Sequence, residues 1–303
     1  MFKITIIGTI TQDIIHLPDR TKTESFGGIS YNLLALSYLN PRNARIYPIC
    51  NLGEDIYEKA LSLLRKRKNI ITKGVKKSKG KNNEVRLFCR KSGKRKEFLL
   101  GLAPPLNFAQ IKPYLDSDII LINFISGFDL SLKTLERIRR NTKRPIFIDI
   151  HSLTLGIRKN GERFQCKPKL WKRYLKCADI LQMNWEELLV LSDKKIKNKN
   201  QTRKWGEKIL KSGPKVLIIT LGKGGAFIIY GEDGKIKYHL SPAKLSKTVD
   251  TVGCGDVFTS AFISSWLQRK DFKFSLDFAN RVAGFKAGFS GTNNTKKLSR
   301  FAF

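Results

Sequence analysis

Short apolar runs alternate with helix-like runs along most of this chain. The runs 2–8, 118–126 and 215–222 have the length of single strands and are apolar almost throughout, whereas 29–39 and 130–141 have the length and spacing of helices. Strands without a polar face must be covered on both sides, and the helices between them supply that cover. The pattern predicts an α/β fold with a doubly wound, mostly parallel sheet and helices on both faces. Further elements of the series are expected at 45–53, 55–68, 144–150, 179–184 and 185–192.

Two segments interrupt this alternation and are predicted to form β-hairpins. Residues 225–241 hold two short strands joined by the turn signal Glu232-Asp233-Gly234, and we expect them at the far edge of the sheet. Residues 84–100 hold two more strands around Ser92-Gly93. Such strands cannot be covered on both faces in the middle of a βα series, so they should project from the main domain. An ordinary surface hairpin is the alternative.

Length and composition fit one domain that spans residues 1–303. The hydrophobic content of 41% is enough for a large core. No apolar run reaches the roughly 18 residues of a membrane span, and the opening MFKITIIGTI alternates like a strand and lacks a signal-peptide cleavage site. We therefore expect a soluble, cytoplasmic protein without a membrane partner. The cysteines show no CxxC or zinc spacing, which predicts reduced, buried thiols at 50, 89, 166, 177 and 254.

The chain is strongly basic, with a formal net charge of +33. Clustered Lys and Arg bind nucleic-acid backbones by releasing counterions, and such clusters occur at 65–69, 76–81, 90–96 and 194–200. The basic residues are nevertheless spread over the whole chain, and no aromatic platform or RNP-like motif accompanies them. We expect a solvated surface with weak affinity for polyanions and no specific nucleic-acid partner.

Residues 250–256, Asp-Thr-Val-Gly-Cys-Gly-Asp, form a glycine-rich turn at the start of an apolar helix. The N–H groups of Gly253, Cys254 and Gly255 can point at an anion, and the positive end of the helix adds to the attraction. Asp256 then lies at the edge of that anion. It can accept the proton of an attacking hydroxyl while the amides stabilise charge on a transferred phosphoryl group. The simpler interpretation is a tight bend with an acid in the first turn of a helix.

This stretch resembles the C-terminal signature of the ribokinase-like (PfkB) family of carbohydrate and nucleoside kinases, Asp-Thr-x-Gly-Ala-Gly-Asp. Cys254 alone departs from it, and a small side chain is kept there. The resemblance implies an enzyme that transfers the γ-phosphoryl group of ATP to a hydroxyl of a sugar, with Mg²⁺ on the phosphates. It makes Asp256 the base, the 253–255 amides the anion hole, and Asp250 and Thr251 part of the nucleotide side.

The resemblance extends to a substrate side in the N-terminal half. Asp13 follows the first strand and Gly27-Gly28 precede Asn32 at the spacing where the family binds sugar hydroxyls, so Asp13, Gly28 and Asn32 are the candidate substrate ligands. Gly53-Glu54-Asp55 continues the match, with a helix N-cap as the other reading of Asp55. In the family, strands near residues 10–20 and 84–100 form a small lid over the sugar. A homodimer through the lid is the assembly that this resemblance suggests.

Two further motifs fit the nucleotide side of these kinases. Asn184-Trp185-Glu186-Glu187 resembles Asn-x-x-Glu, in which Glu187 organises Mg²⁺ through water. Residues 220–225 resemble Thr-Leu-Gly-x-x-Gly, which implies nucleotide contacts for Thr220, Gly222 and Gly225, and the small-residue helix at 278–288 lies where the family packs adenine. His151 is either a site residue or a histidine at a strand end.

The acceptor stays open at this point. Ile29, Ser30 and Tyr31 replace the central residues of the family's ribose loop, and a ring stacked on Tyr31 would suit a nucleoside unless that side chain packs in the core. A sugar kinase is the leading hypothesis, and a nucleoside kinase of the same family is the alternative. A hypothesis of another class is a non-catalytic binding or regulatory module with affinity for polyanions.

Overall fold

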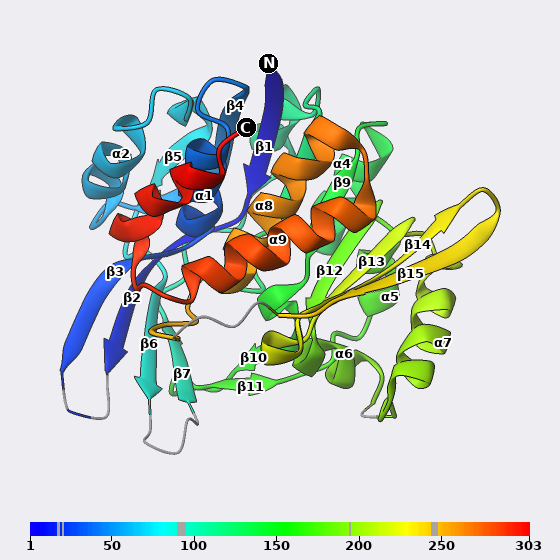
Figure 1. The fold of residues 1–303 in the computed structure, drawn as a ribbon. Helices are drawn as coiled ribbons and strands as arrows, with labels where there is room; N and C mark the ends of the chain where they lie inside the picture. Colours follow the sequence, from blue (N-terminus) through cyan, green and yellow to red (C-terminus); the bar gives the residue numbers. More distant parts are fainter. Residues whose placement is uncertain (17–18, 20, 90–94, 194, 244–247) are drawn as a thin grey trace.

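A nine-stranded sheet forms the centre of the computed structural model, which describes residues 1–303 apart from 17–18, 20, 90–94, 194 and 244–247 (Figure 1). The strand order is β15-β14-β13-β12-β9-β8-β1-β4-β5. All neighbours are parallel except in the β13-β14-β15 edge, which confirms the predicted edge hairpin. The strands are β1 (Phe2–Ile7), β4 (Ala44–Gly53), β5 (Val75–Ser78), β8 (Ile119–Asn123), β9 (Ile146–Asp149), β12 (Ile180–Asn184), β13 (Val216–Thr220), β14 (Ala226–Glu232) and β15 (Lys235–Ser241).

Helices cover both faces of this sheet, as the apolar strands require. One face carries α1 (Ile29–Leu39), α2 (Tyr57–Arg65), α8 (Cys254–Arg269) and α9 (Phe272–Lys286), with the 3₁₀ segment η5 (Thr292–Phe301) beside α1. The other carries α3 (Phe108–Ile111), α4 (Leu132–Arg140), α5 (Trp171–Leu175), α6 (Trp185–Leu191) and α7 (Lys199–Leu210). Shorter 3₁₀ turns are η1 (Thr72–Gly74), η2 (Lys112–Tyr114), η3 (His151–Thr154) and η4 (Gly222–Gly224).

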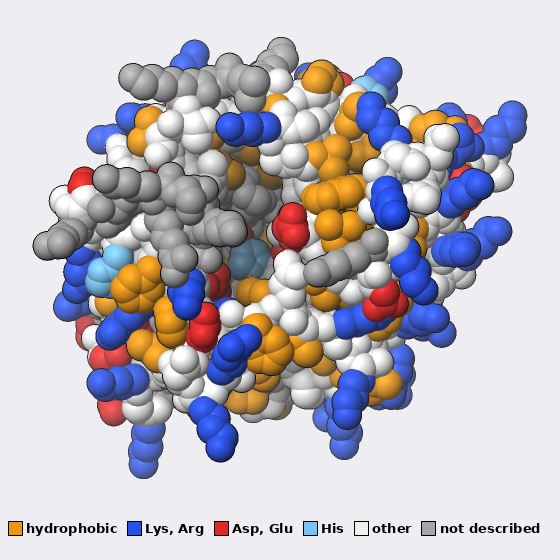
Figure 2. All heavy atoms as spheres, turned by 90° about the horizontal axis from the view of Figure 1, so that it is seen from below, with side chains coloured by type: hydrophobic (Ala, Val, Ile, Leu, Met, Phe, Trp, Pro, Cys, Tyr) orange, Lys and Arg blue, Asp and Glu red, His pale blue; other side chains and the backbone are white. Residues whose placement is uncertain are grey.

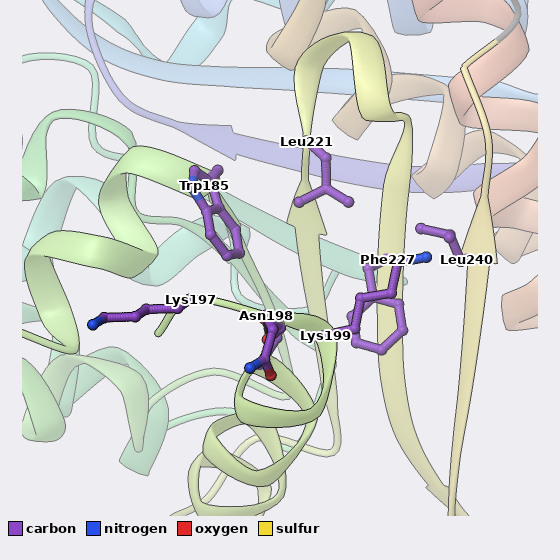
Figure 3. Close-up of a pocket in the computed structure, with 8 residues that line it drawn as sticks. Trp185, Lys197, Asn198, Lys199, Leu221, Phe227 and Leu240 are labelled. Atoms are coloured by element: carbon purple, nitrogen blue, oxygen red, sulfur yellow. Dashed lines mark hydrogen bonds between the residues drawn. The ribbon is translucent and has the colours of Figure 1, made fainter. Parts of the chain in front are cut away.

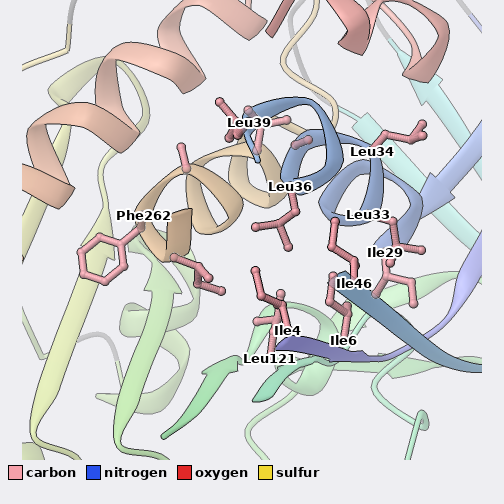
Figure 4. Close-up of a cluster of buried hydrophobic side chains, with 14 of the residues drawn as sticks. Ile4, Ile6, Ile29, Leu33, Leu34, Leu36, Leu39, Ile46, Leu121 and Phe262 are labelled. Carbon is pink, nitrogen blue, oxygen red and sulfur yellow. The ribbon is translucent and has the colours of Figure 1, made fainter. Parts of the chain in front are cut away.

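Each strand contributes to two cores because its side chains alternate between the faces. Ile4 and Ile6 of β1 pack with α1 and α8, and Figure 4 shows them beside Leu33 and Leu36 of α1. Ile7 faces the opposite core. Helix α1 is buried on nearly all sides, which places its N-terminus deep inside the molecule.

A second sheet of four strands, in the order β3-β2-β6-β7, projects from the main domain below the central sheet in Figure 1. Its strands are β2 (Ile10–His16), β3 (Lys22–Gly28), β6 (Glu84–Cys89) and β7 (Arg95–Leu100). The predicted projecting hairpin is confirmed, and we call the four strands the lid. The predicted turn at Ser92-Gly93 lies outside the described residues. A dimer through the lid stays a prediction.

Some elements were absent from the sequence prediction. Strand β5 lies inside the interruption, and α7 has a polar sequence in which few positions are buried. The third small sheet, β10 (Leu155–Ile157) with β11 (Arg163–Gln165), has strands too short to leave a pattern. Cys50 and Cys177 are buried as expected, but Cys89 and Cys254 are half-buried and Cys166 is exposed, so the expectation that all thiols are buried was wrong for these three, which lie at the end of β6, at the start of α8 and directly after β11. No helix in the described ranges is long and apolar enough to cross a membrane.

Candidate active site

A cavity of about 500 Å³ lies where the carboxyl ends of β9, β12 and β13 meet the lid and the start of α8. The ends of parallel strands and the N-terminus of a helix open on the same side of such a sheet, which is where α/β proteins bind ligands. In Figure 2, which looks at the molecule from below Figure 1, acidic and histidine side chains lie near the centre of this face, and Lys and Arg lie mainly around them. Among the described residues that line the cavity, none is Lys or Arg.

Asp256 lies in the first turn of α8 and lines this cavity. Asn123, the last residue of β8, donates its Nδ2 hydrogen to Oδ1 of Asp256 at 2.8 Å. Burial raises the pKa of Asp256, while the charge of His151 and the hydrogen bond from Asn123 lower it. The result is a fixed carboxylate with increased basicity beside a helix N-terminus, as a general base requires.

The turn before α8 has the predicted shape but not the predicted set of free amides. Gly253 is the N-cap of α8 in the left-handed region, with φ of 75°. Cys254 donates its N–H to the carbonyl oxygen of Thr251 at 3.2 Å, so the prediction of three free amides was wrong at Cys254. This hydrogen bond closes the turn itself. Gly253 and Gly255 line the cavity, and their amides are the two that the turn leaves for an anion.

Asn32, a predicted substrate ligand, does not line the cavity. Its side chain is fully buried, donates Nδ2 to the carbonyl oxygen of Asp256 at 2.9 Å, and accepts from Nδ2 of Asn123 at 3.0 Å. It therefore ties α1 to the first turn of α8 and helps to position Asp256. Its place on α1, one turn below the cavity, explains the difference, because the cavity is reached by the helix N-terminus at Gly28.

Asp13 lies in the cavity on lid strand β2, as predicted for a substrate ligand. Thr11 donates its hydroxyl to Oδ1 of Asp13 at 2.6 Å. A Cβ at Gly27 would lie 1.9 Å from the Asp13 carboxylate, and one at Gly28, with φ of 58°, would lie 2.2 Å from the carbonyl oxygen of Thr9. The absence of side chains at the two glycines thus lets the backbone lie directly against the Asp13 carboxylate and the Thr9 carbonyl.

Tyr31 packs beneath the anion-binding turn. Its side chain is 2% exposed, and a Cβ at Gly253 would lie 2.5 Å from its ring. The ring thus fills the space directly beneath the turn. Of the two roles considered for Tyr31, the packing role is the one that these contacts support.

Asn184 and Glu187 form a reciprocal cap at the start of α6. Glu187 accepts from the backbone N–H of Asn184 at 2.8 Å and from its Nδ2 at 2.6 Å, and Asn184 Oδ1 accepts from the N–H of Glu187 at 2.9 Å. Both residues also line the cavity. Burial raises the pKa of Glu187, and the charge of Asp149 raises it further. The motif therefore caps a helix and presents a buried carboxylate to the cavity.

His151 lines the cavity too, which settles its position in favour of the site. It follows β9 with a positive φ of 32°, an uncommon backbone conformation for this residue type. Burial lowers its pKa, but the charges of Asp256 and Asp149 outweigh burial and raise it overall. Protonated His151 would supply positive charge among the cavity carboxylates.

A second cavity, of about 390 Å³, lies on the other side of the 220–225 turn. Its lining includes Thr220, Gly222, Gly225 and Thr251, as predicted, together with small residues of the 278–288 segment such as Ala283. Thr220, Gly222, Thr251 and Gly255 line both cavities, so the two are continuous along this turn.

Two predicted acids have structural roles instead. Asp250 lines neither cavity, and its Oδ1 accepts from the N–H of Val252 at 2.9 Å, which stabilises the turn. Asp55 is not the N-cap of α2, which is Ile56. Its carboxylate accepts from the N–H of Asn82 at 3.0 Å and so holds the segment that leads from β5 into lid strand β6.

A third cavity, of about 370 Å³, lies beside these two without joining the predicted site. Trp185, Leu221 and Phe227 point into it from α6, the 220–225 turn and β14 (Figure 3). Lys197 and Asn198 form its edge at the start of α7. Its walls are mainly apolar, and none of the described residues that line it lines either of the other two cavities.

Sequence reasoning missed several residues of the site. Asn123 is the last residue of β8 and Gln182 lies within β12, and Gln182 donates Nε2 to Oδ2 of Asp149 at 2.7 Å. Glu97 of the lid also lines the first cavity. A polar amide inside an otherwise apolar strand run is the signal that could have identified Asn123 and Gln182. No comparable signal exists for Glu97, which lies in a charged stretch.

Burial of Asp13 predicts a distinct dependence of stability on pH. Burial raises the pKa of its carboxyl from an ordinary value of 3.8 to about 7. The folded protein thus binds this proton more tightly than the unfolded chain, so the stabilisation is full below about pH 4 and is lost as pH rises to about 7. Asp13→Asn should therefore gain stability relative to wild type by about 1.4 kcal/mol for each pH unit in that interval. Denaturant unfolding at pH 5, 6 and 7 measures this difference, and parallel profiles for the two proteins would contradict it.

The comparisons with known proteins agree on one family. The sequence model described as pfkB family carbohydrate kinase matches residues 1–298. A ribokinase of Arabidopsis thaliana is 36% identical over 110 residues, which are 36% of this chain and 28% of that protein. The curated relatives are matched over only a quarter to about a third of their own length.

Solved structures show the same fold at low sequence identity. The ribokinase of Arabidopsis thaliana complexed with ribose and ATP has a TM-score of 0.76 and 19% identity, with 99% of each chain covered. A pyrophosphate-dependent kinase in the ribokinase family, complexed with a pyrophosphate analog and myo-inositol, also has a TM-score of 0.76 and 19% identity, with 97% of this chain and 98% of that chain covered.

Proposed function

This chain belongs to the pfkB family of carbohydrate kinases, and we propose that it transfers the γ-phosphoryl group of ATP to a hydroxyl group of a sugar. The observation that carries the proposal is the buried carboxylate of Asp256, held by Asn123 in the cavity wall directly beside the Gly253–Gly255 turn. A base and an anion site are thus adjacent at one helix N-terminus, which is the minimum that in-line phosphoryl transfer to a hydroxyl requires.

In this proposal, Asp256 takes the proton of the attacking hydroxyl as the oxygen bonds to the γ-phosphorus. The bond between the γ-phosphorus and the bridging oxygen of ADP breaks, and the charge on the transferred group is stabilised by the amides of Gly253 and Gly255. Asn123 keeps the carboxylate aimed at the cavity through its hydrogen bond. Protonated His151 would offset part of the negative charge nearby.

ATP is the donor that the second cavity favours. Its small side chains, such as Ala283 and Ala287, and the ring of Phe258 form a wall that suits a flat purine. Pyrophosphate, the donor named for one structural relative, would leave this space unused. A comparison of ATP and pyrophosphate at equal concentration tests the choice, and we expect activity with ATP. Equal or higher activity with pyrophosphate would contradict the ATP assignment and leave the phosphotransferase proposal intact.

The residues present fit a magnesium ion held mainly by phosphates and water. No group of three or more His, Cys, Asp or Glu within the described ranges is placed to hold a metal by itself. Glu187 is a buried carboxylate in the cavity, and burial and the charge of Asp149 raise its pKa, so a nearby cation would favour its ionised form. Glu187 would hold Mg²⁺ through water, since this ion keeps much of its hydration. Bound to the phosphates, Mg²⁺ supplies positive charge.

The residues that line the first cavity favour an uncharged polyol as the phosphoryl acceptor. Asp13, Glu97 and Asp149 line the cavity, and carboxylates accept hydrogen bonds from hydroxyl groups. Tyr31 lines the cavity, but its ring is 2% exposed and packs against Gly253, which leaves little of it to stack on a base. We therefore place a sugar before a nucleoside, which stays the alternative within the family.

A screen of phosphorylated product over D-ribose, other neutral sugars, myo-inositol and adenosine, with MgATP, tests the proposed function. We expect a neutral polyol to give the highest kcat/KM. Highest kcat/KM for adenosine would favour the nucleoside alternative. Absence of product for every acceptor class, with ATP binding retained, would favour the non-catalytic module.

The basic surface gives a separate prediction, which tests the hypothesis of a non-catalytic module with affinity for polyanions. If the basic residues form a solvated surface, retention of DNA or RNA should be independent of sequence. It should vanish by a few tenths molar salt, because electrostatic attraction then reaches less than about 8 Å. Binding of DNA fragments of unrelated sequence, measured across a salt series, tests this. Sequence-selective binding that persists at such salt would support a nucleic-acid module.

A further inference from the structure

Lys286 is a fully buried lysine at the last position of α9. Lysine is rarely buried without a partner, because water solvates its charge better than a protein interior does. Within the described ranges, the other buried cation is Arg163, which lies beside the lid. The position of Lys286 therefore needs a physical explanation.

The contacts of Lys286 all involve the region behind the anion-binding turn. Its Nζ donates to the carbonyl oxygen of Phe289 at 3.0 Å. The same Nζ lies 5.7 Å from the ring centroid of Tyr31 and 5.3 Å from that of Phe289. Both distances fall within the range of cation–π attraction, which is stronger away from water.

The residue after Lys286 anchors the turn itself. The carbonyl oxygen of Ala287 accepts from the N–H of Val249 at 2.7 Å and from the N–H of Asp250 at 3.1 Å. Tyr31, in turn, packs against Gly253. Lys286 thus lies between the anchor of the 249–256 segment and the ring that supports its glycine.

We propose that Lys286 is a positioning residue for phosphoryl transfer: a built-in positive charge that seats Tyr31 beneath Gly253 and so holds the turn that carries Asp256. The role rests on the proposed function, because it concerns the same base and anion-binding turn. The ammonium touches neither substrate nor the transferred group. It acts by holding the Tyr31 ring in place and through the electrostatic field of its positive charge.

Electrostatics supports this role. Burial raises the pKa of Asp256; the charge of His151 and the hydrogen bond from Asn123 lower it, and the charge of Lys286 lowers it by a smaller amount. Several groups face Asp256 from the elements around it. These groups are Asp13 of β2, Tyr31 of α1, Asn123 of β8, Asp149 of β9, His151 of η3, Glu187 of α6 and Lys286 of α9.

The competing explanation is that Lys286 only caps the C-terminus of α9 through its bond to Phe289. The two explanations differ in what they require. A cap needs a hydrogen-bond donor, which a neutral glutamine supplies. The proposed role needs charge, which arginine keeps and glutamine lacks.

The test measures pH profiles of kcat/KM for Lys286→Met, Lys286→Gln and Lys286→Arg. The assay uses MgATP and the best acceptor among D-ribose, myo-inositol and adenosine. Lys297→Met is the matched control, because Lys297 also lies over the Phe289 ring, at 5.4 Å, but is exposed. Loss of a nearby cation raises the pKa of a carboxyl, so the acid limb should move to higher pH by about 0.5–1 unit in the Met and Gln variants. It should stay within about 0.2 unit of wild type in the Arg variant and the control.

An unshifted acid limb in Lys286→Gln, with wild-type kcat, would overturn the proposal in favour of the cap. If Lys286→Met does not fold, the Gln and Arg variants still decide between charge and hydrogen bond. Failure of the proposed function is distinguishable, because wild-type protein would then form no phosphorylated product at any pH. An active wild type whose neutral variants keep the wild-type acid limb contradicts the role of Lys286 alone.

Discussion

Asp256→Asn is expected to lower kcat by about 10²–10⁴-fold while ATP binding and folding stay close to wild type. The amide is isosteric with the carboxylate, and its oxygen can still accept from Nδ2 of Asn123, so the wall of the cavity should persist. What is lost is the capacity to take the proton of the acceptor hydroxyl. Steady-state kinetics with MgATP and saturating acceptor, together with calorimetric ATP binding, measures both quantities.

Asp271→Asn is the matched control for this variant. Asp271 also lies at a helix N-terminus, where its Oδ1 accepts from the N–H of Phe274 at 2.9 Å, but it lines neither proposed site cavity. Asparagine is an equally good cap, so kcat should stay unchanged there. If Asp256→Asn retained wild-type kcat, the base would have to be another group.

Gly253→Ala is expected to reduce kcat by about 10²–10³-fold, comparable to the loss of an oxyanion-hole donor. A methyl group would lie 2.5 Å from the Tyr31 ring, at a residue whose φ is 75°. The ring is buried and cannot withdraw, so the turn must move, and its amides then point away from the phosphoryl group. Measured kcat and the melting temperature together test this.

Gly234→Ala controls for backbone strain alone. Gly234 also has a positive φ, of 71°, but a Cβ there meets nothing within 4 Å, and it lies at the tip of the β14–β15 hairpin. This variant should lose about 1 kcal/mol of stability and no activity. A similar small loss of kcat in both glycine variants would show that the contact with Tyr31 has no bearing on catalysis.

Some predicted site residues line the cavities and others do not, because the motifs differ in how far they specify the direction of a side chain. Thr220, Gly222 and Asp256 end a strand or begin a helical turn, and such positions converge at one edge of a parallel sheet whatever the packing. Asn32 lies within a helix and Asp250 within a turn. In such segments, a backbone rotation equivalent to one residue decides whether a side chain faces the cavity or packs inside the protein. That rotation depends on what packs behind them, here Asn123 and Val252.

The sequence by itself determined the layered α/β fold, the edge hairpin, the lid and the place of the glycine-rich turn at 250–256. These follow from local quantities: the length and apolarity of runs such as 118–126, turn residues, and glycines whose conformation side chains disfavour. Only the tertiary structure decided which side chains face the cavity. Asn123, His151 and Glu97 come from a strand end, a 3₁₀ turn and the lid, and contacts between such distant segments depend on packing that leaves no periodic pattern in the chain. Burial, which raises the pKa of Asp256 and makes the charge of Lys286 significant, arises only when those segments assemble.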